Sequence, residues 1–288
     1  MTFSGNSDHW TCADEMATAR NRMHRLPTTL WGNKHRSDIR HAFFGTDQPY
    51  ACDALLPFYR RTADDATDMD AQRFRRLLRE HLAVYGRDPD RARFLDKTHA
   101  YTVKIPLLAT LLGDAKPFFV LVVRNPYETC RWAIERKLQL FRPGLLRDKR
   151  VGLMAEHWSN SYGIALRDAE TVPNVAAVRF EDFLADPEAL VRALCEFVQL
   201  DFDSAMVPQA GQQLPFATLP DDRKWYPLYP SDWLEGMTGD EQAIIGRRCS
   251  SHAERFGYTP QGALPSAAPI EILERSRRSA EHMRPAAS

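Results

Sequence analysis

The most constraining feature of the sequence is a short apolar run, Phe118 to Val123, that lies between two segments of helical character. Its residues, FFVLVV, are mostly aromatic or β-branched, and none of them is polar. A strand with this composition is typical of a parallel sheet, in which helices cover both faces. The run is therefore predicted to be an inner strand of an α/β fold.

The residues around this run indicate how the chain passes from strand to strand. Gly113-Asp114 ends the preceding helical segment, and Asn125-Pro126 stops the strand and starts the next helix. With an earlier strand that ends near Lys97, the order strand, helix, strand, helix predicts a right-handed βαβ crossover. Ligands of such sheets bind beyond the carboxyl ends of the strands. Lys97-Thr98-His99 and Arg124-Asn125-Pro126 are both expected at that edge.

The order of these motifs resembles that of the PAPS-dependent sulfotransferase family. In that family a K-T-H follows one core strand and an R-N-P or R-D-P opens the helix after the next strand, as at Lys97 and Arg124 here. The similarity continues through Val178–Pro187, VRFEDFLADP, which is similar to the family's Y-E-D-L…D-P segment, and it extends over residues 30–258. It implies a three-layer α/β/α domain with a short central parallel sheet, the P-loop nucleotide-hydrolase-like sulfotransferase fold.

We expect this domain to occupy residues 1–258. Residues 259–288 are rich in Pro, Ala, Ser and Arg, a composition that predicts a flexible C-terminal tail. Within the domain, apolar spacing predicts helices over 71–85 and 151–170 and a strand over 175–180. Thr238 and Glu241 have the spacing of a capping box and predict the start of a last helix, 238–256. The basic segment 138–150 is expected to be a mobile loop beside the substrate.

The resemblance also implies a reaction, the transfer of a sulfuryl group from PAPS to a hydroxyl or amine of a small molecule or glycan, with adenosine 3′,5′-bisphosphate as product. His99 would be the general base, because imidazole titrates close to neutral pH. Lys97 lies two residues away on the same side of an extended segment and would offset developing charge. Arg124 would bind the 3′-phosphate, since a guanidinium offers two parallel donors to it.

These residues also have local explanations that the sequence leaves open. His99 and Lys97 could serve only hydrogen bonds at a strand end, and Arg124 could pair with a nearby carboxylate such as Glu128. A sulfotransferase-like protein without catalysis, which acts as a binding or scaffold protein, is therefore the alternative to an enzyme.

Two further family features are matched only in part. A late R-K-G loop of the family grips the 3′-phosphate, and Arg223-Lys224 are its predicted counterparts here, with Trp225 in place of the glycine. On the helix after Arg124, the family has a serine where this chain has Trp132, and Thr129 or Arg131 are the candidate replacements.

The family's phosphate loop, of the form P-K-S-G-T-T-W or P-R-S-G-T-T-L, has no such counterpart near the N-terminus. Residues 1–10 fall in its place, and Asn6 or Ser7 stands where the family has a basic residue. The strand before the loop is expected to be missing. Either the loop has degenerated, which favours the non-catalytic alternative, or the sequence starts late.

The bulk composition limits the remaining possibilities. The formal net charge is zero, so we expect no nucleic-acid partner. No apolar run approaches the roughly 18 residues of a membrane-spanning helix, so we expect no membrane partner. The five cysteines are scattered without C-x-x-C spacing, and together with the lack of a signal peptide they predict reduced thiols, a cytoplasmic location and no metal site.

Overall fold

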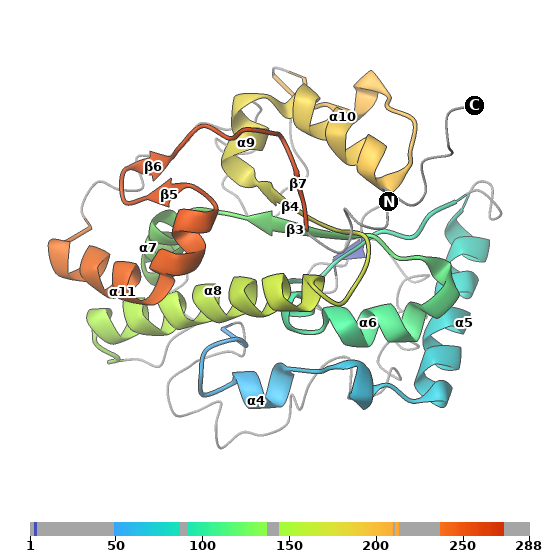
Figure 1. Cartoon of the computed structure of the whole chain (residues 1–288), viewed down its shortest axis with the longest axis horizontal. Coiled ribbons are helices and arrows are strands. Elements are labelled where there is room, and N and C mark those ends of the chain that lie inside the picture. The colour runs from blue at the N-terminus through green and yellow to red at the C-terminus, as the bar shows by residue number, and fades with distance from the viewer. Residues whose placement is uncertain are drawn as a thin grey trace.

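The computed structural model describes residues 3–4, 49–86, 92–136, 144–209, 211–212 and 237–273 of the chain. In this part strands and helices alternate, which confirms the predicted α/β class (Figure 1). The helices are α4 Leu56–Tyr59, α5 Asp68–Tyr85, α6 Ile105–Leu112, α7 Pro126–Arg136, α8 Arg147–Ala169, α9 Phe180–Ala185, α10 Pro187–Val198 and α11 Gly239–Arg255. The strands are β1 Phe3–Ser4, β2 Asp96–Lys97, β3 Phe119–Val123, β4 Val175–Arg179, β5 Tyr258–Thr259, β6 Gly262–Ala263 and β7 Glu271–Ile272.

A small mixed sheet lies at the centre of the molecule, with the strand order β3-β4-β7. β3 and β4 are parallel and in register from Phe119 opposite Val175 to Val123 opposite Arg179, and β7 runs antiparallel beside β4. In Figure 1, α6, α8 and α11 lie below β3 and β4, and α9 and α10 lie above them. The expected arrangement of helices on both sides of a short sheet is therefore present, with an antiparallel edge strand added to the parallel pair.

Burial differs between the two parallel strands. Every residue of β4 is buried, as expected for an inner parallel strand. In β3, Leu121 and Val123 are buried, but Val120 and Val122 are 37% and 58% exposed. The prediction that the apolar run is buried on both faces is therefore wrong for β3, because successive side chains of a strand point to opposite faces and only one face meets the main core.

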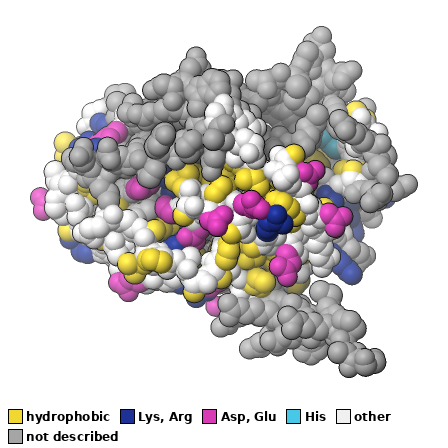
Figure 2. Space-filling view, turned by 90° about the horizontal axis from the view of Figure 1, so that it is seen from above, with side chains coloured by type: hydrophobic (Ala, Val, Ile, Leu, Met, Phe, Trp, Pro, Cys, Tyr) yellow, Lys and Arg dark blue, Asp and Glu magenta, His cyan; other side chains and the backbone are white. Residues whose placement is uncertain are grey.

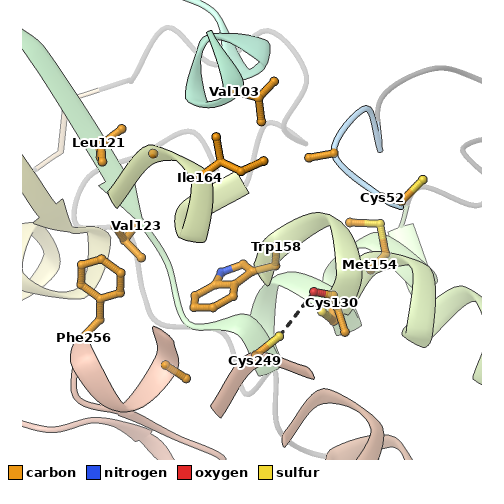
Figure 3. Close-up of a cluster of buried hydrophobic side chains, with 14 of the residues drawn as sticks. Cys52, Val103, Leu121, Val123, Cys130, Met154, Trp158, Ile164, Cys249 and Phe256 are labelled. Carbon is orange, nitrogen blue, oxygen red and sulfur yellow. Dashed lines mark hydrogen bonds between the residues drawn. The ribbon is translucent and has the colours of Figure 1, made fainter. Parts of the chain in front are cut away.

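The main hydrophobic core lies between the sheet and the helices α7, α8 and α11 (Figure 3). Figure 3 shows Trp158 of α8 among Val123 of β3, Cys130 of α7 and Cys249 of α11. α8 and α11 approach closely at Gly163, where a Cβ atom would lie 2.5 Å from Nε2 of His252. A side chain at position 163 would therefore have to displace the His252 imidazole.

The helix starts mostly follow their sequence signals. The capping box of α11 is formed, with the Thr238 Oγ1 accepting from the Glu241 amide at 3.2 Å and the Glu241 carboxylate accepting from the Thr238 amide at 3.0 Å. α8 begins at Arg147, so the end of the segment expected to be a loop, 138–150, is helical instead. Arg147 pairs there with the buried carboxylate of Glu241, a contact that composition alone does not reveal.

A strand at the N-terminus corrects another expectation. β1 was expected to be missing, yet Phe3 and Ser4 pair in parallel with Asp96 and Lys97 of β2. A two-residue strand is too short to show a hydrophobic period, which is why the sequence pattern did not reveal it. Residues 5–48, which include the segment in the place of the phosphate loop, lie outside the described residues.

The first part of the predicted C-terminal tail is also ordered. β5 and β6 form an antiparallel hairpin, and β7 joins the central sheet. The amide group of Asn125 donates to the carbonyls of Thr259 and Gly262, and Leu273 is buried. The expectation of a flexible tail from residue 259 is therefore wrong as far as Leu273, because long-range contacts hold a segment whose composition is typical of loops. Residues 274–288 lie outside the described part.

Candidate functional site

The Lys97-Thr98-His99 segment leaves the carboxyl end of β2, as predicted. The side chains of Lys97 and His99 are exposed. Beside them, the Asp96 carboxyl group accepts two hydrogen bonds. The Thr98 hydroxyl donates to Asp96 Oδ1 at 3.2 Å, and the Tyr101 hydroxyl donates to Asp96 Oδ2 at 2.7 Å. Burial raises the pKa of Asp96. This carboxyl group holds the turn and leaves Lys97 and His99 on the surface.

β1 ends at the same edge as β2. The two strands are parallel, with Ser4 opposite Lys97, so the carboxyl end of β1 lies beside the end of β2 that carries the Lys97–His99 segment.

Two residues that the sequence analysis missed surround His99. The hydroxyl of Tyr50 donates to the carbonyl oxygen of His99. His157 of α8 packs edge-on against the Tyr50 ring, with centroids 4.7 Å apart. Burial, together with the charge of His99, lowers the pKa of His157 to about 3. Neither residue belongs to a motif, and both are far from His99 in sequence, so no local signal could have identified them.

Arg124 leaves the carboxyl end of β3. Its guanidinium lies over the Phe180 ring, 4.9 Å from the ring centroid, and its Nη2 is 3.5 Å from Glu128 Oε2. The side chain is 33% exposed. The pKa of Glu128 is raised by burial, against an opposing effect of Arg124. The local ion pair that the sequence left open as an alternative is thus formed, but at a distance longer than that of a good charged hydrogen bond.

Asn125 locks the turn that carries Arg124. Its side chain is fully buried, and its Oδ1 accepts from the Tyr127 amide at 2.9 Å at the start of α7. Its backbone N–H donates to Glu181 Oε1 at 2.9 Å, and the Tyr258 hydroxyl donates to the other oxygen of this carboxylate at 2.7 Å. The backbone at Arg124 is therefore held by α9 and by the hairpin at Tyr258.

The candidate replacements for the family's serine are held within α7 or its cap. The Thr129 hydroxyl donates to the Asn125 carbonyl at 2.8 Å, and Arg131 Nε is 3.0 Å from Glu135 Oε1. Trp132, which stands at the serine position, packs against the main core. Arg223, Lys224 and Trp225 lie outside the described residues.

Helix α8 brings the two candidate clusters to one place. The Nε1–H of Trp158 donates to the Arg124 carbonyl at 2.9 Å, and the Tyr162 hydroxyl donates to the Val122 carbonyl at 2.9 Å. His157, the residue before Trp158 on α8, lies close enough to His99 for the charge of His99 to lower the pKa of His157. Consecutive residues of one helix turn thus approach both His99 and Arg124.

The outer face over α9 and α10 has a different charge character. Figure 2 shows this face, where acidic side chains surround few basic ones. The exposed acidic residues of α10, its cap and the loop that follows are Asp186, Glu188, Glu196, Asp201 and Asp203. Such a surface repels phosphate and sulfate groups, so the ends of β2 and β3 remain the candidate anion site.

Two observations concern other kinds of site. In the described part of the chain, no group of three or more His, Cys, Asp or Glu side chains could hold a metal ion. No helix there has the length and apolar character needed to cross a membrane.

Comparisons with known proteins give a match to one family model and matches to solved structures. The model of the Sulfotransferase family matches residues 6–204, a range that includes Lys97, His99 and Arg124 and ends before Arg223. Among solved structures, the chain is similar to a sulfotransferase domain from the curacin biosynthetic pathway, with 14% identity, coverage of 84% of each chain and a TM-score of 0.39. No curated protein sequence matches the chain.

Proposed function

The chain belongs to the sulfotransferase family, and we propose that it transfers a sulfuryl group from PAPS to a hydroxyl or amine of a small molecule or glycan. The product of the donor is adenosine 3′,5′-bisphosphate. The observation that carries the proposal is that His157 and Trp158, neighbours on α8, approach His99 and the Arg124 backbone. One turn of α8 thus approaches both the segment that carries the His99 imidazole and the segment that carries the Arg124 guanidinium.

The proposed roles follow from the chemistry of these groups. PAPS, when bound, supplies a sulfuryl group whose bond to the phosphate oxygen breaks as the acceptor oxygen or nitrogen bonds to sulfur, as in phosphoryl transfer. His99 takes the proton that the acceptor loses, and Lys97 offsets negative charge that develops on the oxygen of the leaving phosphate. Lys97 and His99 lie two residues apart at the end of β2, so both can face one bound substrate.

Arg124 is proposed to bind the 3′-phosphate, together with Arg223 and Lys224. Its side chain is partly exposed, and a phosphate oxygen would replace the 3.5 Å contact with Glu128 by a shorter charged hydrogen bond. The residues described around Arg124 fit a phosphate only in part. The guanidinium can bind an anion, but Glu128 and Glu181 place negative charge near the same site, which opposes binding.

A calorimetric titration with adenosine 3′,5′-bisphosphate tests this proposal. Loss of a hydrogen bond to a charged group costs about 1.5–3 kcal/mol, so Arg124→Ala is expected to weaken binding roughly 10- to 100-fold. The matched control is Arg192→Ala on α10, because Arg192 also pairs with a glutamate four residues away, at 2.7 Å, and lies 3.7 Å from the centroid of the Phe202 ring. The control is expected to bind as the wild type does.

Two results would contradict the assignment. A folded wild-type chain that does not bind the nucleotide removes the nucleotide site altogether. Equal affinity of the Arg124→Ala and Arg192→Ala variants would show that Arg124 is only a structural residue.

The non-catalytic alternative is favoured by one observation, the Arg124–Glu128 ion pair together with the core position of Trp132. A non-catalytic protein would bind the nucleotide or the acceptor without transferring a sulfuryl group. Incubation with sulfur-labelled PAPS and a panel of hydroxyl and amine acceptors separates the two functions. Label that passes to an acceptor in the wild type, but not in His99→Ala, supports the enzyme.

A further inference from the structure

We propose that Tyr50 and His157 are positioning residues that hold His99 in the orientation needed for proton transfer. The inference rests on the proposed function, in which His99 is the general base. It extends that function to two residues that lie outside the family motifs and that reach His99 only through the tertiary structure.

Tyr50 holds the backbone of His99. Its hydroxyl donates to the His99 carbonyl and lies 3.0 Å from Thr102 Oγ1, which itself donates to the same carbonyl at 3.1 Å. Tyr50 is buried, and burial raises the pKa of its hydroxyl to about 12. The hydroxyl therefore keeps its proton and remains a donor at any pH at which the enzyme is expected to work.

His157 supports Tyr50 and borders His99. Its ring meets the Tyr50 ring at an interplanar angle of 90°, and its Nδ1 is 3.2 Å from the amide nitrogen of Ala51, which donates to it. Because Nδ1 accepts, the proton of the neutral imidazole is on Nε2. With its pKa lowered to about 3, His157 stays neutral when His99 accepts a proton, so it adds no repelling charge.

The turn that carries Tyr50 is itself tightly anchored. The amide group of Asn160 donates to the Ala51 carbonyl at 2.8 Å and to Asp53 Oδ1 at 2.7 Å. The Arg248 guanidinium on α11 donates to both oxygens of Asp53, at 2.6 and 2.7 Å. The turn is thus held by α8 and α11, which gives Tyr50 the fixed position that a positioning residue needs.

The charged and titratable groups near this cluster come from several elements. They include Tyr59 on α4, Glu156 and Tyr162 on α8, Arg248 on α11, Cys52 and Asp53 on the turn, and Asp96, Lys97 and Tyr101 around β2. Asp96 is already engaged by Tyr101 and Thr98, and Glu156 accepts from the Asp53 amide at 3.3 Å. We therefore assign the support of His99 to the neutral pair Tyr50 and His157.

An NMR titration of the histidine Cε1–H signals of the full chain tests the positioning without need of activity. In the wild type the His157 signal should not titrate between about pH 5 and 9, because its pKa is lowered to about 3. Tyr50→Phe and His157→Phe should each shift or broaden the His99 signal. The control is His252→Gln, since His252 packs on Gly163 of α8 and has no described hydrogen bond to Tyr50, His157 or His99, so the variant should leave the His99 signal unchanged.

Kinetics with PAPS and an acceptor test the consequence for catalysis. His157→Phe should lower kcat about tenfold with little change in KM, because a small misplacement of a catalytic group slows the chemical step. His157→Gln should recover most of this loss, since its amide oxygen can accept from the Ala51 amide. Tyr50→Phe should lower kcat several-fold and, like His157→Phe, alter the pH profile of kcat. Circular dichroism confirms that each variant is folded, and Tyr50→Phe alone serves for the NMR test if His157→Phe does not fold.

The outcomes separate this inference from the proposed function. A wild-type chain that transfers no sulfuryl group contradicts the proposed function, and the NMR titration then decides the positioning alone. A His99 signal that is the same in the wild type, Tyr50→Phe and the His157 variants overturns the positioning role. So does a loss of kcat that is equal in His157→Phe, His157→Gln and the His252→Gln control.

Discussion

Arg124 and Arg179 end two neighbouring parallel strands, yet they have different surroundings. Val123 lies opposite Arg179 in the register of β3 and β4, so the two arginines are almost level. The Arg179 side chain is 9% exposed and donates to both oxygens of Asp182, at 2.8 and 2.5 Å, and to the Phe256 carbonyl at 2.9 Å. The Arg124 side chain is 33% exposed and pairs with Glu128 at 3.5 Å.

A position at the end of a strand therefore does not by itself make an arginine a ligand-binding residue. Arg179 is held by a carboxylate in the first turn of α9 and by the carbonyl at the end of α11, so its hydrogen bonds stabilise the fold. Arg124 has a weaker contact with its carboxylate and more exposure, so a phosphate can compete for it at a smaller cost. The two residues should therefore respond differently to substitution.

The largest expected effect is on stability. Arg179→Leu leaves Asp182 without its partner at a mostly buried site, which typically costs about 3–5 kcal/mol in the free energy of unfolding. Arg124→Leu should cost less, because the contact of Arg124 with Glu128 is longer, at 3.5 Å, and its guanidinium is more exposed. Urea unfolding of both variants measures the difference. Equal losses of unfolding free energy in the two variants would contradict this difference and would show that Arg124 is a structural residue as well.

A smaller effect is expected from the carboxylate beside Arg124. Glu128→Gln removes the charge that competes with a phosphate for the guanidinium, so the affinity for adenosine 3′,5′-bisphosphate should rise about tenfold, or about 1.4 kcal/mol. Calorimetric titration measures the change. The control is Glu188→Gln, which removes the partner of Arg192 and should not alter nucleotide affinity. Weaker binding in Glu128→Gln would mean that Glu128 orients Arg124 instead of competing for it.

The smallest effect is a dependence on pH. Burial raises the pKa of Glu128, so this carboxyl group takes up a proton at a higher pH than an exposed glutamate does. As the pH falls through this raised pKa, wild-type Glu128 becomes neutral and stops competing. The affinity advantage of Glu128→Gln over the wild type should therefore be greatest at neutral pH and should shrink several-fold toward about pH 5.

Comparison of the two proteins at each pH cancels the titration of the nucleotide's own phosphates. A ratio of affinities that does not change with pH would show that the Glu128 charge has no influence on the site.

Some of the site could be predicted from sequence because its signals are local. The K-T-H and R-N-P segments were expected at the carboxyl ends of two strands, and β2 and β3 end at Lys97 and Val123. The capping box at Thr238 and the helix over 71–85 were expected from residue spacing, and α11 and α5 confirm them, although α5 begins at Asp68.

Other features depended on contacts between distant residues. Tyr50 reaches the His99 carbonyl across 49 positions, and Asn125 reaches the Thr259 carbonyl across 134. β1 was too short to give a pattern, and the composition at residues 259–273 is typical of a loop although the segment packs on the sheet. None of these contacts has a periodic signal that a single sequence displays.

The α/β class, the order of the main strands and helices, and the place of the candidate residues at strand ends could be predicted from sequence alone. These depend on propensities, caps and hydrophobic periods that act over a few neighbouring residues. Which arginine is committed to the fold, which carboxylate faces Arg124, and which side chains lie behind His99 became known only from the three-dimensional packing. Burial and charge pairing depend on what packs nearby in space, and packing brings together residues that the chain keeps far apart.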